Sequence, residues 1–79
     1  MLMIPVDSSL IKQIGYDGET LRVQFNDKKT GAGGKFYDYR DVPENIYDDL
    51  LSAESVGKFF HANIKGKYQT FAVEVERDQ

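Results

Sequence analysis

Residues 37–43 read Tyr-Asp-Tyr-Arg-Asp-Val-Pro, and this stretch decides the fold of the 79-residue chain. Tyr37 and Tyr39 stand two residues apart, and residues two apart in a strand point to the same face of a sheet. Pro43 follows where the spacing of apolar residues changes, and proline suits the first turn of a helix because no N–H is needed there. We therefore expect this stretch to connect a sheet to the helices that cover it.

The sequence before this stretch predicts a hairpin. Residues 10–16 favour a strand, in which Gly15 indicates a bulge or a close packing contact. Asp17-Gly18 predicts a tight turn, since both residue types tolerate positive φ. Residues 21–26 alternate apolar and polar side chains, which is typical of an antiparallel strand with one buried face. Residues 1–9 offer apolar side chains that can add to an edge of the sheet.

Residues 26–34 predict a loop, because their three glycines lower any regular preference. Residues 36–41 then form the third expected strand. We expect Tyr37 and Tyr39 to share the buried face with the apolar side chains of residues 21–25, and so to point toward the helices. The alternative is an exposed aromatic platform of the kind on which sheet-based modules stack unpaired bases.

The sequence after this stretch predicts two helices. Apolar residues recur at helical spacing beyond Pro43. Ser55 suits the N-cap of a second helix whose apolar stripe includes Phe60. Gly57 costs about 1 kcal/mol in a helix relative to alanine, so we expect it to let another backbone approach closely. Gly66 predicts the end of this helix.

Residues 68–75 alternate once more and predict a fourth strand. The expected fold class is therefore α+β: a small antiparallel sheet, made of a three-stranded meander and a fourth C-terminal strand, with two helices covering one face. The length is that of one domain, residues 1–79.

Composition narrows the function. The chain has no cysteine, which excludes thiol catalysis and cysteine-ligated zinc and is typical of a reducing compartment. The chain contains ten Lys and Arg residues and thirteen Asp and Glu residues, which give a net charge of −3. Most nucleic-acid-binding domains are basic. No apolar run approaches the ~20 residues of a membrane helix. We expect a soluble, cytoplasmic protein without a cofactor.

Several short motifs in order resemble the KTSC domain, a small module named after the C-terminus of some lysyl-tRNA synthetases that also occurs as a free-standing bacterial and phage protein. They cover about residues 6–68 and are Asp-Ser-Ser at 7–9, Ile-Gly-Tyr at 14–16, Tyr-Asp-Tyr at 37–39, Val-Pro at 42–43, Ala-Glu-Ser-Val-Gly-Lys-Phe-Phe at 53–60 and Ile-Lys-Gly-Lys-Tyr at 64–68. The resemblance implies the α+β fold, and RNA binding is a suggestion made for the family. The residues that carry it as structural motif positions are Tyr37, Tyr39, Pro43, Gly57 and Phe60.

The chain departs from the family pattern at two places. The loop between the second and third strands is longer than usual, and residues 69–79 extend beyond the usual end of the domain. The loop can serve as a binding loop, and the extension as an extra edge strand or a pairing surface for another chain.

Lysines are the candidate nucleic-acid-binding residues. One group surrounds the glycine-rich loop and the other follows the second expected helix; the members are Lys28, Lys29, Lys35, Lys58, Lys65 and Lys67. We expect a non-catalytic RNA-binding module. The alternative is a protein-interaction module that acts through an exposed strand edge, including self-association through the C-terminal strand, or through the acidic helix face of Glu44, Asp48 and Asp49.

Catalytic and metal sites find no support. The Gly-Ala-Gly-Gly-Lys stretch at 31–35 lacks the first glycine and the final Ser or Thr of a phosphate-binding loop. His61 is the only histidine, so a zinc site has no partner residues. As a general base, His61 would need Ser8, Ser9 or Ser55 close in space. We expect His61 at the surface, no metal and no enzymatic activity.

Overall fold

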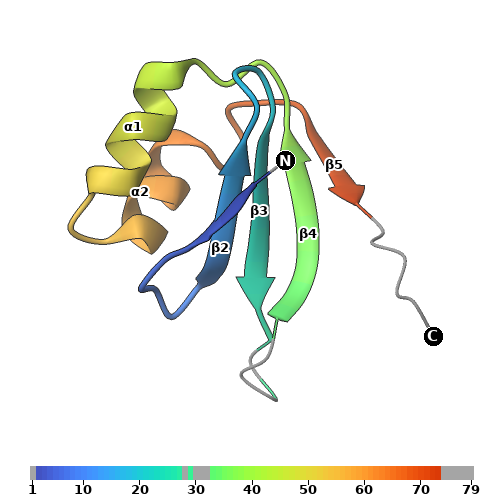
Figure 1. Ribbon diagram of the computed structural model, residues 1–79, viewed down its shortest axis with the longest axis vertical. Helices are drawn as coiled ribbons and strands as arrows, with labels where there is room; N and C mark the ends of the chain where they lie inside the picture. Colours follow the sequence, from blue (N-terminus) through green and yellow to red (C-terminus); the bar gives the residue numbers. More distant parts are fainter. Residues whose placement is uncertain (1, 28, 30–32, 74–79) are drawn as a thin grey trace.

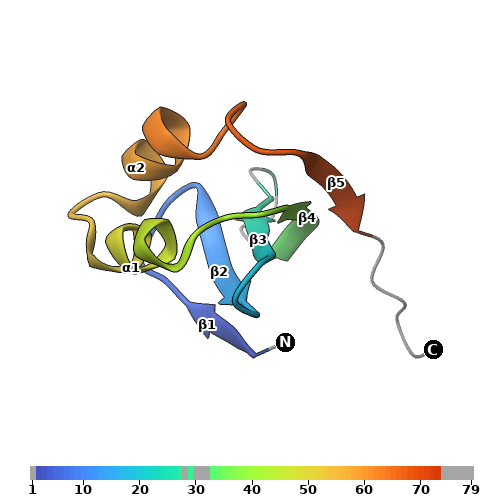
Figure 2. The same ribbon diagram turned by 90° about the horizontal axis from the view of Figure 1, so that it is seen from above.

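The computed structural model describes residues 2–27, 29 and 33–73 of the chain. Within these residues the elements are β1 (Met3–Pro5), β2 (Ile11–Tyr16), β3 (Leu21–Asn26), β4 (Gly33–Tyr39), α1 (Glu44–Ser52), α2 (Val56–Asn63) and β5 (Thr70–Val73). The strands form one antiparallel sheet in the order β1-β2-β3-β4-β5. Both helices lie on one side of it (Figures 1 and 2). The predicted α+β fold is confirmed, with one strand more than expected.

The additional strand is β1. It pairs with β2 through the registers Met3↔Gly15 and Pro5↔Gln13. A proline is tolerated here because β1 lies at the edge of the sheet, where one side of the strand needs no ladder hydrogen bond. Three residues are too few to show a period of two, so the sequence indicated only apolar side chains that can join an edge.

Gly15 does not form a bulge. It pairs with Arg22 in the regular part of the ladder, whereas the register shifts lie between Ile11 and Gln13 and between Gln24 and Asn26. The predicted tight turn after β2 is present, with Gly18 at φ +97°. Asp17 supports it, because its carboxylate accepts hydrogen bonds from the backbone N–H groups of the two residues after Gly18.

β4 begins at Gly33, three residues before the predicted start at residue 36. The loop prediction was therefore too long at its C-terminal end. Gly34 is required in this strand, since a Cβ there would lie 2.9 Å from the Phe25 carbonyl oxygen. Lys28 and residues 30–32 lie outside the described residues.

The expected connection between sheet and helices follows Tyr39. Asp41 has φ +58°, the left-handed region that non-glycine residues seldom adopt. Val42 is 1% exposed; its N–H donates to the Glu19 carbonyl at 2.9 Å, and its carbonyl accepts from the Tyr16 hydroxyl. The chain is thus held against the β2–β3 turn before Pro43, which directly precedes α1.

The helices bury one side each against the sheet. Leu50 of α1 and Phe60 of α2 are at most 1% exposed. Tyr47 of α1 stacks on Tyr16 of β2 with a centroid distance of 4.6 Å, and burial raises the pKa of both tyrosines. Ser55 caps α2 by accepting a hydrogen bond from the Lys58 N–H at 3.3 Å, as predicted.

Tyr37 and Tyr39 point to the helix-covered face, as predicted. Tyr39 is 5% exposed and meets Phe60 edge to face at 5.3 Å. Tyr37 is half-buried and meets Phe25 edge to face at 5.6 Å. Between them, Asp38 points to the opposite face, where it pairs with Arg22.

Gly57 packs against side chains rather than a backbone. A Cβ at this position would lie 3.4 Å from the Leu10 Cβ and 3.5 Å from the Ser8 Oγ. After α2, Gly66 has φ +76°, so the predicted glycine turn is present. Neither helix in the described part of the chain has the length and apolar character needed to cross a membrane.

Candidate nucleic-acid interface

The predicted lysines occupy two ends of the fold. Lys58 lies in α2, and Lys65 and Lys67 lie in the turn after it; all three are exposed. Lys29 and Lys35 are also exposed, beside the end of β3 and at the start of β4. Lys28 is outside the described residues.

Lys65 and Lys67 are not brought together with Lys35. The segment from α2 to β5 crosses the end of the sheet at which β4 finishes (Figure 1), and Gln69 of this segment accepts a hydrogen bond from the Arg40 N–H at 2.9 Å. Gly33, where β4 starts, is at the opposite end of the strand. Lys65 and Lys67 therefore belong to one end of β4, and Lys35 to the other.

A cleft opens between α2 and strands β3 to β5. Its volume is about 340 Å³. Four aromatic side chains line it, Phe25, Tyr37, Tyr39 and Phe60. Their edge-to-face contacts, such as 5.4 Å between the centroids of Phe25 and Phe60, fix the rings relative to one another. We call this hollow the aromatic cleft.

Polar groups border the aromatic cleft. The exposed side chains of His61 and Lys65 lie along it, together with Thr70 at the start of β5. Burial raises the pKa of Tyr39 to about 12, with a smaller contribution from the charge of Tyr37. Within the described residues, the Tyr39 hydroxyl has no hydrogen-bond partner closer than 3.5 Å.

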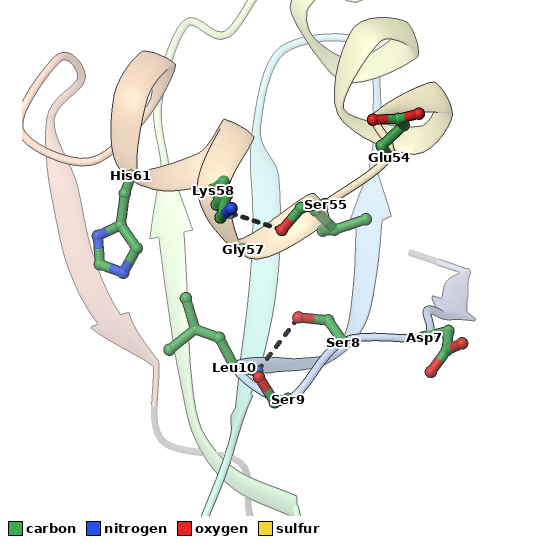
Figure 3. Close-up of a pocket in the computed structure, with 10 residues that line it drawn as sticks. Asp7, Ser8, Ser9, Leu10, Glu54, Ser55, Gly57, Lys58 and His61 are labelled. Atoms are coloured by element: carbon green, nitrogen blue, oxygen red, sulfur yellow. Dashed lines mark hydrogen bonds between the residues drawn. The ribbon is translucent and has the colours of Figure 1, made fainter.

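A second hollow of about 440 Å³ lies at the N-terminus of α2 (Figure 3). Three serines line it, Ser8, Ser9 and Ser55, with Lys58 and His61 beside them. Figure 3 shows Glu54 and Asp7 at one end of this hollow and His61 at the other. We call it the serine pocket.

The serine pocket gathers the residues of a conceivable nucleophile–base pair without forming one. The Ser8 Oγ accepts from the N–H groups of Leu10 and Ile11 at 3.1 and 3.3 Å, and the Ser55 Oγ serves as the α2 cap. Among the described residues, His61 shares no hydrogen bond with any of the three serines. Ser8 thus stabilises the turn before β2 and Ser55 caps α2, and the predicted surface position of His61 is confirmed.

The two hollows adjoin each other, because Leu10 and His61 line both of them. We refer to the two adjoining hollows together as the groove along α2, which is aromatic at one end and lined by serine hydroxyl groups, Asp7 and Glu54 at the other. The sequence indicated Lys58 and Lys65 as candidate binding residues but gave no sign of the two hollows that they line. Their walls come from residues 7–10, β3, β4 and α2, and no local pattern shows that these segments meet.

Acidic side chains do not gather into a metal site in the part of the chain that the structure describes. The acidic residues of α1, Glu44, Asp48 and Asp49, are exposed on its outer side. The arrangement is thus that of a small α+β domain with two adjoining hollows along α2.

Known proteins are similar to this chain in fold and in sequence. The KTSC domain family model matches residues 7–68. The crystal structure of a KTSC domain protein from Yersinia pestis has a TM-score of 0.79 at 37% identity, covering 92% of this chain and 97% of that chain. A protein from Tsukamurella paurometabola is 38% identical over 73 residues, which are 90% of this chain and 100% of that protein. The chain belongs to the KTSC domain family.

The family also reaches larger proteins. A lysine–tRNA ligase from Nostoc punctiforme is 33% identical over 69 residues, and one from Trichormus variabilis is 32% identical over 69 residues. These residues make up 85% of this chain but 11% of each ligase. The chain therefore spans about a tenth of the ligases that it matches.

Proposed function

We propose that this protein is a non-catalytic module that binds RNA. One observation carries the proposal: Lys58 and Lys65 each line one of the two adjoining hollows along α2, and Lys67 follows two residues after Lys65. All three lysines are exposed, and none of them forms an ion pair with another described residue. Lysine contacts to the phosphate backbone are the main source of affinity in most nucleic-acid complexes.

The relatives support the same class of ligand. Lysine–tRNA ligases, by their name, act on a tRNA, and two of them contain a stretch similar to 85% of this chain. That stretch is a small part of each ligase, so the support concerns RNA as a class. The net charge of −3 does not oppose binding beside Lys65, because the acidic residues of α1 line neither hollow, and the acidic side chains of Asp7 and Glu54 lie at the opposite end of the serine pocket from His61.

Fluorescence anisotropy of a labelled single-stranded RNA at low and moderate salt tests the proposal. If three lysines each neutralise one phosphate, the logarithm of the binding constant falls with the logarithm of salt with a slope of about −2. Lys65→Glu is expected to weaken binding and flatten this slope. Lys12→Glu is the matched control, since Lys12 is exposed on β2 and lines neither hollow. Absence of binding by the wild type at low salt contradicts the proposal.

A second candidate function is protein interaction through β5. This strand is the outermost of the described sheet on one side, and its Phe71 is 48% exposed. A free strand edge with an exposed aromatic residue favours pairing with another chain, including a second copy of this one. Light scattering after size exclusion tests self-association: Phe71→Asp lowers the mass if β5 pairs, whereas a wild-type monomer at all concentrations rules this version out.

A further inference from the structure

We propose that the aromatic cleft accepts one unpaired base of a single-stranded RNA, while the adjoining groove along α2 holds the neighbouring phosphates. This assignment rests on the RNA binding proposed above and makes it specific. It names a base-binding site, and it predicts a preference for unpaired over paired RNA.

The size of the cleft sets the kind of group that enters. About 340 Å³ lies at the lower end of the ~300–1,000 Å³ of small-molecule sites. One planar base fits a space of this kind, whereas a base in a duplex must first lose its pairing and stacking to reach it, which disfavours paired RNA. The ligand is therefore unpaired at this position.

The walls favour a planar aromatic group. Phe25 and Tyr37 are half-buried, so parts of both rings remain accessible from the cleft. Aromatic side chains are the usual stacking partners of unpaired bases in RNA-binding domains. Phe60 and Tyr39, at 1% and 5% exposure, form the floor beneath them.

The Tyr39 hydroxyl supplies a polar contact at the floor. Tyr39 lines the cleft and its hydroxyl makes no hydrogen bond with the other described residues, and since no buried side-chain oxygen among them lacks a partner, this hydroxyl is open to a ligand in the cleft. Bases carry ring nitrogens and carbonyl oxygens on their edges, and these can accept a hydrogen bond from the hydroxyl. An aliphatic side chain of a peptide would leave the hydroxyl without a partner.

The charge along the cleft favours a nucleic acid over an acidic or neutral peptide. None of the described residues that line the cleft is acidic, and Lys65 is beside it. From His61 the groove continues to Lys58 and the hydroxyl groups of the serine pocket. A base in the cleft thus places the neighbouring phosphates along α2 beside Lys58 and the serine hydroxyl groups, while the acidic side chains of Asp7 and Glu54 lie at the far end of the serine pocket from His61.

The test compares two neighbouring residues of β4 whose side chains point to opposite faces of the sheet. Tyr37→Leu keeps an apolar side chain in the wall of the cleft but removes the stacking ring. Phe36→Leu is the control, because the preceding residue faces the other side of the sheet. The probe is a fluorescein-labelled oligouridine of twelve nucleotides, with an RNA duplex of the same length as competitor. We expect Tyr37→Leu to weaken binding about ten-fold at an unchanged salt slope. Phe36→Leu should bind as the wild type does, and the duplex should compete poorly.

A second measurement needs no variant in the cleft. Titration of ¹⁵N-labelled wild-type protein with the same oligouridine should shift the amide resonances of Leu10, Gly66 and Thr70, which line the cleft. Salt-sensitive binding with unchanged affinity in Tyr37→Leu and no shifts at these amides overturns the base-binding cleft but leaves RNA binding intact. Failure of the wild type to bind either RNA removes both proposals.

Discussion

The two faces of the sheet are stabilised in different ways, and the alternation of residues 37–39 shows it within a single strand. On the helix-covered face Tyr39 is buried among apolar side chains, with Phe60 at 5.3 Å. On the other face Asp38 accepts two hydrogen bonds from Arg22, at 2.7 Å from Nε and 3.0 Å from Nη2. One face depends on non-directional burial, and the other on directional polar pairs.

The polar face continues this pattern beyond the ion pair. Gln13 donates to Gln24 at 2.7 Å, and Gln24 in turn donates to the Gly34 carbonyl at 3.2 Å. This network leaves Gln24 only 8% exposed although no helix covers it. The comparison shows why a ligand is expected on the helix side: α2 covers Tyr39 of β4 but leaves Phe25 and Tyr37 only half-buried, and their accessible surface lines the cleft.

The largest expected effect comes from the apolar face. Phe60→Ala removes a ring that contacts Phe25 and Tyr39, and its loss should cost about 3–5 kcal/mol of unfolding free energy. A domain of this size has little stability to spare, so the variant should be largely unfolded in thermal and urea denaturation. Phe71→Ala, at an exposed aromatic residue, should change stability by less than about 0.5 kcal/mol. Equal effects of the two substitutions would contradict the difference between the faces.

Alkaline pH should destabilise the packing of the helix-covered face through the ionisation of Tyr39. The pKa of Tyr39 is about 12 in the folded protein because burial disfavours the phenolate, whereas an unfolded tyrosine ionises near 10. The stability of the folded protein is therefore unaffected by the ionisation of this tyrosine below about pH 10. As the pH rises from 10 to 12, ionisation of Tyr39 in the unfolded chain lowers the free energy of unfolding by up to about 2 kcal/mol.

The comparison with Tyr39→Phe isolates this contribution, since Tyr16 and Tyr47 also have raised pKa values through burial. Urea denaturation at pH 8 and pH 11 should show a smaller loss of stability in the variant than in the wild type. At pH 8 we expect Tyr39→Phe to be nearly as stable as the wild type, since the hydroxyl bonds to none of the described residues. A loss of 1–3 kcal/mol at pH 8 would mean that the hydroxyl has a partner.

The ion pair of the polar face should have a smaller effect. The side chains of Arg22 and Asp38 are 32% and 17% exposed, so solvent screens part of their attraction. The hydrogen bonds to Asp38 raise the already high pKa of Arg22, which keeps it charged at all working pH values. A double-mutant cycle with Arg22→Gln and Asp38→Asn should give a coupling energy of about 1 kcal/mol. Additive effects would show that the ion pair contributes no measurable coupling energy to stability.

The smallest expected effect tests how tightly α2 packs. An alanine Cβ at position 57 meets Leu10 and Ser8 at ordinary contact distances, so Gly57→Ala should gain helix propensity without a clash. We expect a stabilisation of about 0.5 kcal/mol in thermal denaturation. Gly57→Val is the matched variant, because its branched side chain must displace Leu10. A destabilised alanine variant would show that α2 requires a closer approach than the contacts indicate.

Local patterns predicted much of the fold. Alternation over residues 21–26 identified a strand and its buried side, and the same rule directed Tyr37 and Tyr39 to the helices. Ser55 as the N-cap and Gly66 after α2 were predicted because capping and positive φ depend on a few adjacent residues. The single domain of residues 1–79 and the lysines as binding residues stay predictions.

Other features depended on distant segments. β1 was not predicted as a strand because it exists only by pairing with β2. The early start of β4 was missed because three glycines look like a loop, although Gly34 must approach the Phe25 carbonyl. Asp41 gave no sign of its left-handed φ, which is imposed where Val42 is held by the β2–β3 turn and by Tyr16.

The sequence by itself determined the class of fold, the direction of the two tyrosines and the ends of α2. The physical reason is that side-chain periodicity and caps are properties of a few neighbouring residues. Only the tertiary structure decided that residues 7–10, α2 and β4 enclose one groove, and that Lys65 and Lys35 belong to opposite ends of β4. Such adjacency depends on how the sheet twists and where its helices stop, and residues far apart in the chain set both.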